Sequence, residues 1–392
     1  MGPPGVIRTH PTWKLVRRRS YASQIFWYTG AAKELGVRHQ NLHLPQGTEA
    51  YYLDEAYVHR RLVRAFEERC ELWGYLPVQT PVYDFHELYR GLTDQNRENS
   101  TYRLVDRAGD LLVLRSDITL FLARQMGLVL DRDDLPVRVY YGDTILRHED
   151  PHDISKNEYF QVGAELIGAT GLEADAEVVL LLFDALGAWG AGDVVVHVGH
   201  RALLHGRDDT AALAPAVAQR DWPRVDYQLR AAGVGSTRRD ALMRLYRFIG
   251  SAGELSTVSA ENADLGEEAR AAIDHLLALA NELDALGYGD RVRIDLSEVG
   301  SQVYHSGIVF QAYAPDMADA IASGGRYDGL LGRFGFDAPS AGFSVMLRRL
   351  QSRQRVTKHP PVPEVSRAEG RTFRERYLEA RHRRSQGKAV SL

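Results

Sequence analysis

A change of residue pattern in the middle of the 392-residue chain constrains its fold. Residues 201–290 are rich in Ala, Leu and Arg, and their apolar residues recur at helical spacing, as in EEARAAIDHLLALANELDALG. Short strand-like runs separated by turn residues lie before and after this stretch. Strands interleaved with turns and flanked by helices are typical of an α+β fold around a mostly antiparallel sheet. We therefore predict one such sheet, built from both flanks, with a small helical insertion at 201–290.

The pattern also places individual elements along the chain. Helical spacing of apolar residues predicts helices at 118–126 and 174–189. An earlier predicted helix ends at Gly74, and its apolar residues at this spacing are Ala56, Val63, Phe66, Cys70 and Trp73. The residues after it, YLPVQTP (75–81), predict a proline-limited strand at an edge or interface. The other expected strands are 111–115, 137–141, 159–167, 193–198, 291–296, 307–313 and 341–346.

These elements divide the chain into five parts. We expect a basic N-terminal extension (1–43), a first core segment (44–200), the insertion (201–290), a second core segment (291–350) and a basic, proline-containing tail (351–392). The tail is helical at best in RTFRERYLEARHRR. Both ends are expected to be mobile and dispensable for the fold.

Charge and cysteine content exclude several classes of protein. Residues 1–40 carry seven Lys and Arg against one acid, and 351–392 carry eleven against four, which leaves 30 bases and 47 acids between them. A core with a net charge of −17 repels a phosphate backbone, so no nucleic-acid partner is expected. The single cysteine, Cys70, excludes an internal disulfide and a cysteine zinc cluster. No apolar run approaches the ~20 residues of a membrane span, and the N-terminal segment lacks a signal-peptide pattern, so we expect a cytoplasmic protein.

Two polar clusters lie where predicted strands end or pair. In LRSDIT (114–119), Asp117 and Thr119 can bind an ammonium group, or Ser116 or Asp117 can simply cap the following helix. In ILRHEDPHDISKNEYFQVGAELIG (145–168), two strands flank a charged loop. Residues spaced by two or four share a strand face, so Arg147 with Glu149 and Gln161 with Glu165 can line one pocket. The alternative is a solvated hairpin face.

Two further clusters follow the insertion. DLSEVGSQVYHSGIVF (295–310) contains Tyr304 and His305, which can form pocket walls or pack as ordinary core residues. In GGRYDG (324–329), Gly324 and Gly325 allow close backbone approach to a ligand, or merely a tight turn. The segment lacks the spacing and the Lys-Ser/Thr pair of a phosphate-binding loop.

In this order, the four clusters resemble the catalytic core of class II histidyl-tRNA synthetases. The resemblance starts at LPQGTEAYY and covers roughly 44–350. It implies a six-stranded antiparallel sheet flanked by helices, with 201–290 as the family's insertion. It also implies a dimer formed through the helix and strand of the Ala56–Pro81 region.

The sequence departs from the synthetases on the nucleotide side. Gly300 stands where the synthetases carry an arginine that stabilises charge during adenylate formation, and the loop DPHDISKNEY offers little positive charge beyond Lys156. Losing one such donor typically costs ~10²–10³ in rate. Arg147, Glu149 and Arg349 persist, but the 42 residues after 350 are fewer than an anticodon-binding domain needs.

A chain of this fold that keeps a histidine pocket but lacks the residues for ATP activation resembles the regulatory subunits of ATP phosphoribosyltransferase. The resemblance implies a chain with no catalytic residue, cofactor or metal, which a short-form catalytic subunit requires for activity and for feedback inhibition by histidine in the first step of histidine biosynthesis. The histidine-binding residues that it implies are Asp117, Thr119, Arg147, Gln161, Glu165, Tyr304, His305, Gly324 and Gly325. Asp117 stands where synthetases use glutamate. Histidine can occupy this pocket or a site nearer the subunit contact.

Two alternatives remain open from the sequence. One is a histidyl-tRNA synthetase or another amino-acid-activating ligase, against which Gly300 counts most directly. The other is a stand-alone histidine-binding protein of the same fold. The presence of a short-form catalytic subunit in the same genome distinguishes this second alternative from a regulatory subunit.

Overall fold

A large sheet forms the centre of the molecule. The computed structural model describes residues 47–48, 50–93, 98–148, 157–204, 213–260, 265–300, 302–354 and 365–392. Nine strands pair in the spatial order β1 (Leu76–Pro77), β5 (Val137–Leu146), β6 (Glu158–Ile167), β12 (Ser340–Met346), β11 (Ala322–Arg326), β10 (Ile308–Tyr313), β7 (Val195–His200), β9 (Val292–Asp295) and β8 (Ile249–Gly250). Within the run of six strands from β5 to β7, every pair of neighbours is antiparallel, which confirms the predicted six-stranded sheet.

Three short strands extend this sheet at its two edges. β1 is parallel to β5, β9 is parallel to β7, and β8 closes the far edge antiparallel to β9. The strand predicted at 75–81 is therefore an edge strand, although only Leu76 and Pro77 pair. β8 lies inside the stretch that we expected to be wholly helical, and two residues are too few to produce an alternating pattern.

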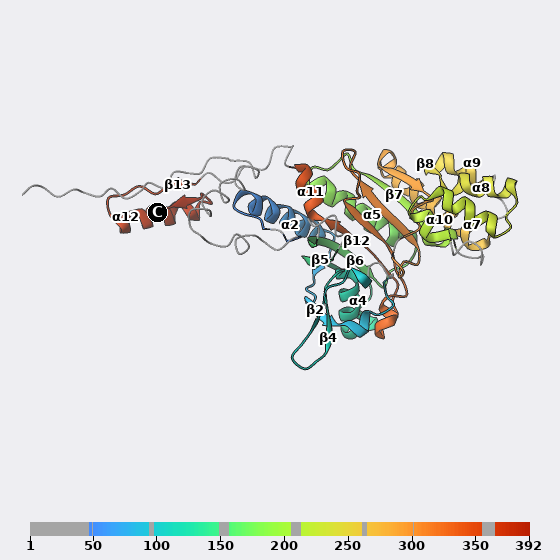
Figure 1. Cartoon of the computed structure of the whole chain (residues 1–392). Coiled ribbons are helices and arrows are strands. Elements are labelled where there is room, and N and C mark those ends of the chain that lie inside the picture. Colours follow the sequence, from blue (N-terminus) through green and yellow to red (C-terminus); the bar gives the residue numbers. More distant parts are fainter. Residues whose placement is uncertain are drawn as a thin grey trace, which may run out of the picture.

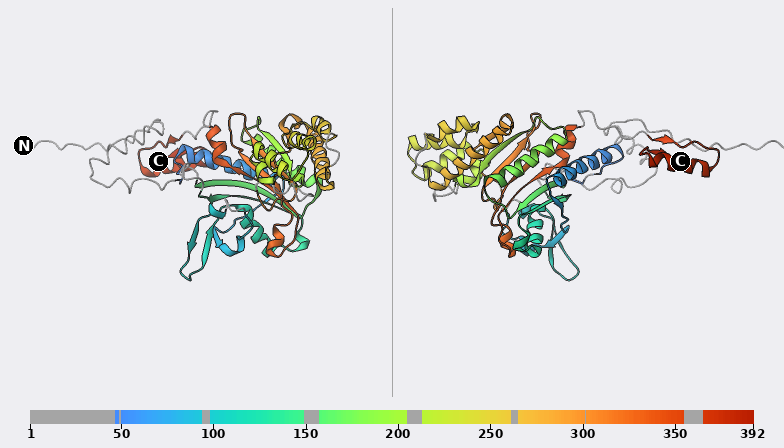
Figure 2. Two further views of the ribbon diagram at one scale, coloured as in Figure 1. Left: turned by 45° about the vertical axis from the view of Figure 1, so that its right-hand side comes forward. Right: turned by 180° about the vertical axis from the view of Figure 1, so that it is seen from behind.

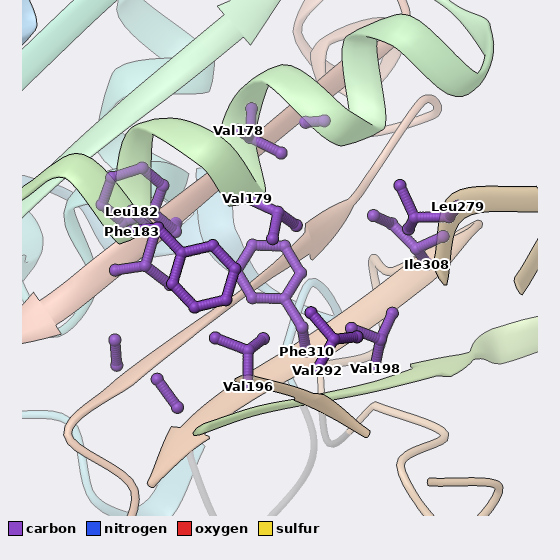
Figure 3. Packing of buried hydrophobic residues seen from close by; sticks show 14 of the residues in the cluster. Val178, Val179, Leu182, Phe183, Val196, Val198, Leu279, Val292, Ile308 and Phe310 are labelled. Atoms are coloured by element: carbon purple, nitrogen blue, oxygen red, sulfur yellow. The ribbon is translucent and has the colours of Figure 1, made fainter. Parts of the chain in front are cut away.

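The two faces of the sheet carry separate apolar cores. Tyr140 of β5 belongs to the cluster under α2 (Asp54–Leu72), α5 (Gly171–Ala188) and α10 (Glu267–Ala285), whereas the next residue, Tyr141, belongs to the other cluster. This division follows from the two-residue repeat of a strand. In Figure 1, α2 and α5 lie above β5 and β6, and Figure 3 shows Phe183 of α5 close to Phe310 of β10.

The opposite face is covered by a smaller layer. It contains α4 (Ile118–Val129) and a three-stranded sheet in the order β2 (Tyr83–Phe85), β4 (Leu111–Leu114) and β3 (Arg103–Val105). Figure 2 shows this layer on the same side of the large sheet from both directions. The predicted helices at 118–126 and 174–189 are confirmed as α4 and α5.

The first long helix ends as the sequence predicted. α2 buries Val58, Leu62, Phe66 and Cys70 along one side. Gly74 follows the last turn with a φ of +79°, the left-handed conformation that glycine adopts at little cost after a helix.

The insertion consists of helices at the β8 end of the sheet. These are α6 (Ala214–Ala218), α7 (Trp222–Ala231), α8 (Ser236–Tyr246) and α9 (Ala252–Ala260), and they lie beyond β7 in Figure 1. The last helix of the stretch, α10, packs against α5, β7 and β9 and therefore belongs to the central core. Helical spacing identified α10 as a helix, but it did not distinguish a core helix from an insertion helix.

Part of the tail has structure of its own. After α11 (Leu347–Gln354), α12 (Phe373–Ser385) begins with a capping box between Thr372 and Glu375, which confirms the predicted helix. Unlike the expected tail, the segment also contains β13 (Ser366–Arg367) and β14 (Val390–Ser391), paired in parallel. Its buried apolar residues are Ala368, Ala380 and Val390, too few to give a sequence pattern. The predicted N-terminal extension (1–43) lies outside the described residues.

Candidate functional site

A polar cavity of about 230 Å³ lies on the central strands, beside the first turn of α4. Its walls come from α4, β6, β10, β11, β12, the segment between β9 and β10, and Arg147, which directly follows β5. All nine predicted site residues line it: Asp117, Thr119, Arg147, Gln161, Glu165, Tyr304, His305, Gly324 and Gly325. Segments up to about 200 positions apart in the sequence therefore meet in one place.

The base of the cavity is a buried carboxyl group that three hydroxyl groups contact. Glu165 on β6 is 1% exposed. It accepts hydrogen bonds from Thr119 Oγ1 at 2.7 Å, from Tyr327 Oη at 2.5 Å and from Tyr141 Oη at 3.4 Å. Burial raises the pKa of Glu165 to about 8, and the hydroxyl donors lower it only in part. At neutral pH this carboxyl group therefore holds a proton for most of the time.

Two glycines make room for this arrangement. A Cβ atom at Gly342 would lie 1.6 Å from Glu165 Oε2, and one at Gly163 would lie 2.3 Å from Tyr141 Oη. We did not predict Tyr141, Tyr327 or Gly342 as site residues. The sequence contained one usable signal, because Tyr327 lies within the GGRYDG segment.

The opening turn of α4 carries the second group of polar residues. Asp117 is the N-cap residue of α4, but its side chain makes no capping hydrogen bond. Its Oδ2 atom lies 3.8 Å from Arg147 Nη2, and Arg147 Nε donates to the Ser116 carbonyl oxygen at 2.7 Å. Gln161 Oε1 instead accepts from the Ile118 N–H at 3.5 Å. The prediction that the Asp117 side chain caps the helix is therefore wrong.

The solvated-hairpin interpretation of the β5–β6 pair is also wrong for the described residues. Gln161 is 2% exposed and Glu165 is 1% exposed, and both face the cavity. Glu149 and Lys156, which the sequence placed in the connecting loop, lie outside the described residues.

The paired glycines have a packing role. Gly324 and Gly325 lie inside β11 and pair with β10 and β12 on its two sides, so the tight-turn interpretation is wrong. A Cβ atom at Gly324 would lie 2.4 Å from Phe310 Cζ, and one at Gly325 would lie 2.6 Å from the Ile308 carbonyl oxygen. The absence of side chains there lets three strands and an aromatic ring meet at the cavity wall.

The segment between β9 and β10 forms the remaining wall. The Tyr304 ring makes edge contacts with His305 at 5.2 Å and with Tyr327 at 5.9 Å between ring centroids. Gly300 has a φ of +77°, and a Cβ atom there would lie 2.7 Å from His305 Nδ1. An arginine at this position therefore requires both a strained backbone and movement of His305.

The comparisons with known proteins agree with this architecture. A family model described as histidyl-tRNA synthetase matches residues 47–350. An ATP phosphoribosyltransferase regulatory subunit from Moorella thermoacetica is 31% identical over 371 residues, covering 90% of this chain and 92% of the relative. The chain belongs to the family of ATP phosphoribosyltransferase regulatory subunits. Another member, from Geobacter sulfurreducens, is 32% identical, over 81% of this chain and 74% of the relative.

Solved structures show the same fold for this regulatory-subunit family. A structure described as an ATP phosphoribosyltransferase regulatory subunit/histidyl-tRNA synthetase from Bacillus halodurans matches with a TM-score of 0.79 and 25% identity. It covers 89% of this chain and 92% of its own. A histidyl-tRNA synthetase from Nostoc matches with a TM-score of 0.74 and 20% identity, over 91% of this chain and 86% of its own, which shows the fold alone. Across the residues with a described position, no helix is long and apolar enough to cross a membrane.

Proposed function

We propose that this chain is the non-catalytic regulatory subunit of an ATP phosphoribosyltransferase in the first step of histidine biosynthesis. In this proposal it enables a short-form catalytic subunit and transmits feedback inhibition by histidine. The observation that carries the proposal is the cavity. It contains the nine residues expected for histidine, but it has a left-handed glycine, Gly300, where the synthetases carry a catalytic arginine.

The polar groups of the cavity match the three polar parts of histidine. Asp117, Thr119 and Gln161 offer oxygen acceptors to an ammonium group. Glu165, protonated for most of the time at neutral pH, can donate to or accept from an imidazole nitrogen. Arg147 can approach a carboxylate from the end of β5.

The size of the cavity favours an amino acid over an adenylate. Its volume of about 230 Å³ lies below the ~300–1,000 Å³ typical of pockets for larger organic ligands. Arg147 and Arg349 are the arginines that line it within the described part of the chain. With so little positive charge on the nucleotide side, adenylate formation lacks the charge stabilisation that it needs. We therefore place catalysis on the partner subunit.

The proposal includes a dimer that forms through the Ala56–Pro81 region. The apolar stripe of α2 is already buried in its own chain, so a second copy would contact other residues. Leu72 at the end of α2 is 73% exposed and Leu76 in β1 is 68% exposed. These exposed leucines support an interface between two copies in this region.

The decisive experiment mixes the purified chain with a short-form catalytic subunit and measures phosphoribosyl-ATP formation. Activity should appear only in the mixture and should decrease when L-histidine is added. An Asp117→Asn variant should keep the activation and lose sensitivity to histidine if the effector binds in the cavity. Absence of activation, or histidine-dependent pyrophosphate exchange by the chain alone, contradicts the proposal.

A further inference from the structure

One arginine of the helical insertion reaches the wall of the cavity. Arg220 lies in the turn between α6 and α7. Its Nη2 atom is 2.7 Å from Asp295 Oδ2 and 3.4 Å from Glu298 Oε1, and its Nε donates to Ser297 Oγ at 3.1 Å. Asp295 is completely buried, and Glu298 lines the cavity. The insertion therefore contacts the segment that connects β9 to the site.

Arg220 places a guanidinium group beside two buried carboxyl groups, those of Asp295 and Glu298. Burial and the charge of Asp295 raise the pKa of Glu298, whereas Arg220 lowers it. Glu298 Oε2 accepts from Gln311 Nε2 at 2.8 Å, and Gln311 also lines the cavity. His197 Nδ1 also lies 2.9 Å from Asp295 Oδ2, and Tyr313 Oη donates to Glu298 Oε1 at 3.2 Å. Arg220 is the group that contacts both acids from the insertion, so removing its charge weakens the link between Glu298 and the turn.

The backbone at Arg220 is held in an uncommon conformation. Its φ of +54° lies in the left-handed region, which residues other than glycine rarely adopt. Such a conformation persists where surrounding contacts fix it. The contacts of the Arg220 side chain with Asp295 and Ser297 are contacts of this kind, and they link the turn to the cavity wall.

A second polar contact connects α10 indirectly to β11. His275 Nε2 on α10 lies 2.7 Å from Asp175 Oδ2, and Arg326 Nε donates to Asp175 Oδ1 at 2.8 Å. Arg326 directly follows Gly324 and Gly325 in β11. Asp175 belongs to α5, so α10 is connected to β11 through a residue of the central core.

An open space of about 870 Å³ lies at the β8 end of the sheet. It is lined by residues of β7, β8, α9, α10 and β9, among them Glu254, Asp284 and Arg293. The helices α6 to α8 do not line this space, because their buried residues, among them Val217, Val225 and Leu245, pack into the main apolar core.

We propose that Arg220 is a positioning residue of the cavity, and that the helices α6 to α8 respond through it to the binding of a ligand. The identity of that ligand as histidine rests on the function proposed above. A ligand that moves Glu298 or Gln311 must change the contacts of Arg220 and the turn that carries it. This coupling is reciprocal: the factor by which the ligand shifts the conformational equilibrium of the turn is also the factor by which that shift changes the affinity for the ligand.

Hydrogen exchange of the full chain, with and without L-histidine, tests the proposal. The variants are Arg220→Gln, Arg220→Lys and the control Arg230→Gln, whose side chain is 62% exposed and pairs with Asp226 inside α7. In wild type and control, histidine should slow exchange across 213–246. Arg220→Gln should lose this effect and bind histidine at least fivefold more weakly, and Arg220→Lys should be intermediate. Circular dichroism and thermal melting confirm that each variant is folded.

A ligand-free comparison separates this inference from the identity of the ligand. Without histidine, Arg220→Gln should exchange faster than Arg230→Gln in β10, which carries Gln311. If the two variants exchange equally fast in β10, the coupling is overturned, whatever the effect of histidine. Histidine binding that leaves 213–246 unchanged in wild type overturns it as well. A difference in β10 together with no histidine binding supports the coupling and removes histidine as the ligand.

Discussion

The Thr119 hydroxyl group donates a 2.7 Å hydrogen bond to Glu165 Oε1, which joins the first turn of α4 to the middle of β6. The two residues are 46 positions apart in the sequence. Tyr327 reaches the other oxygen of the same carboxyl group from 162 positions away. The cavity is therefore organised around one buried acid whose partners come from separate elements, and substitutions there test the site directly.

The buried carboxyl group should make stability fall as pH rises. The pKa of Glu165 is about 8 in the folded chain against 4.5 when unperturbed, so the folded state binds more protons between these values. The free energy of unfolding should therefore decrease by up to ~1.4 kcal/mol per pH unit over that range from this group alone. Urea unfolding of wild type and Glu165→Gln at pH 5.5, 6.5 and 7.5 measures the difference in slope. An identical change at the exposed Glu87 is the control, and equal slopes for wild type and Glu165→Gln would contradict the assignment.

Gly342 should tolerate no side chain. A Cβ atom there lies 1.6 Å from Glu165 Oε2 and 2.5 Å from the Ala164 carbonyl oxygen, so Gly342→Ala must displace a strand or the carboxyl group. Overpacking of this kind should cost about 3 kcal/mol of unfolding free energy. Gly329→Ala, where nothing lies within 4 Å of the added Cβ atom, is the matched control. Chemical denaturation of both variants decides the matter, and similar midpoints would show that the strand relaxes freely.

The sequence predicted most strands of the central sheet because successive side chains of a strand point to opposite faces. Tyr140 and Tyr141 illustrate this, since they enter different apolar clusters. It did not predict the contacts of Arg220, because that residue lies in a stretch with ordinary helical composition and its partner Asp295 is 75 positions away. Likewise, nothing local to Tyr141 indicates that its hydroxyl group meets Glu165. Long-range polar contacts have no periodic signature.

The residues at the start of α4 and on β6 should control histidine affinity. Asp117→Asn and Gln161→Ala each remove an acceptor from the cavity, and each should weaken L-histidine binding by about tenfold, since a hydrogen bond to a charged group contributes ~1.5–3 kcal/mol. Isothermal titration calorimetry measures both. Asp133→Asn, on the exposed turn after α4, should bind like wild type. Unchanged affinity in both cavity variants would place the effector site elsewhere.

Restoring the missing arginine should not restore amino-acid activation. In Gly300→Arg the new side chain starts from a left-handed backbone, and its Cβ atom lies 2.7 Å from His305 Nδ1. The backbone conformation alone should cost ~1–2 kcal/mol. Histidine-dependent pyrophosphate exchange should stay at background, and the thermal midpoint should fall. A clear gain of exchange activity would show that this one position separates the chain from an active synthetase.

The exposed leucines near the end of α2 should hold two copies together. Leu76→Glu places a charge on β1 at a residue that is 68% exposed in the single chain, so a monomer should tolerate it whereas an apolar interface should not. Light scattering at micromolar concentration should show a dimer for wild type and a monomer for the variant. Leu286→Glu, at a 51% exposed residue after α10, is the control and should stay dimeric. A wild-type monomer, or a dimer that survives Leu76→Glu combined with Leu72→Glu, would move the interface away from the Ala56–Pro81 region.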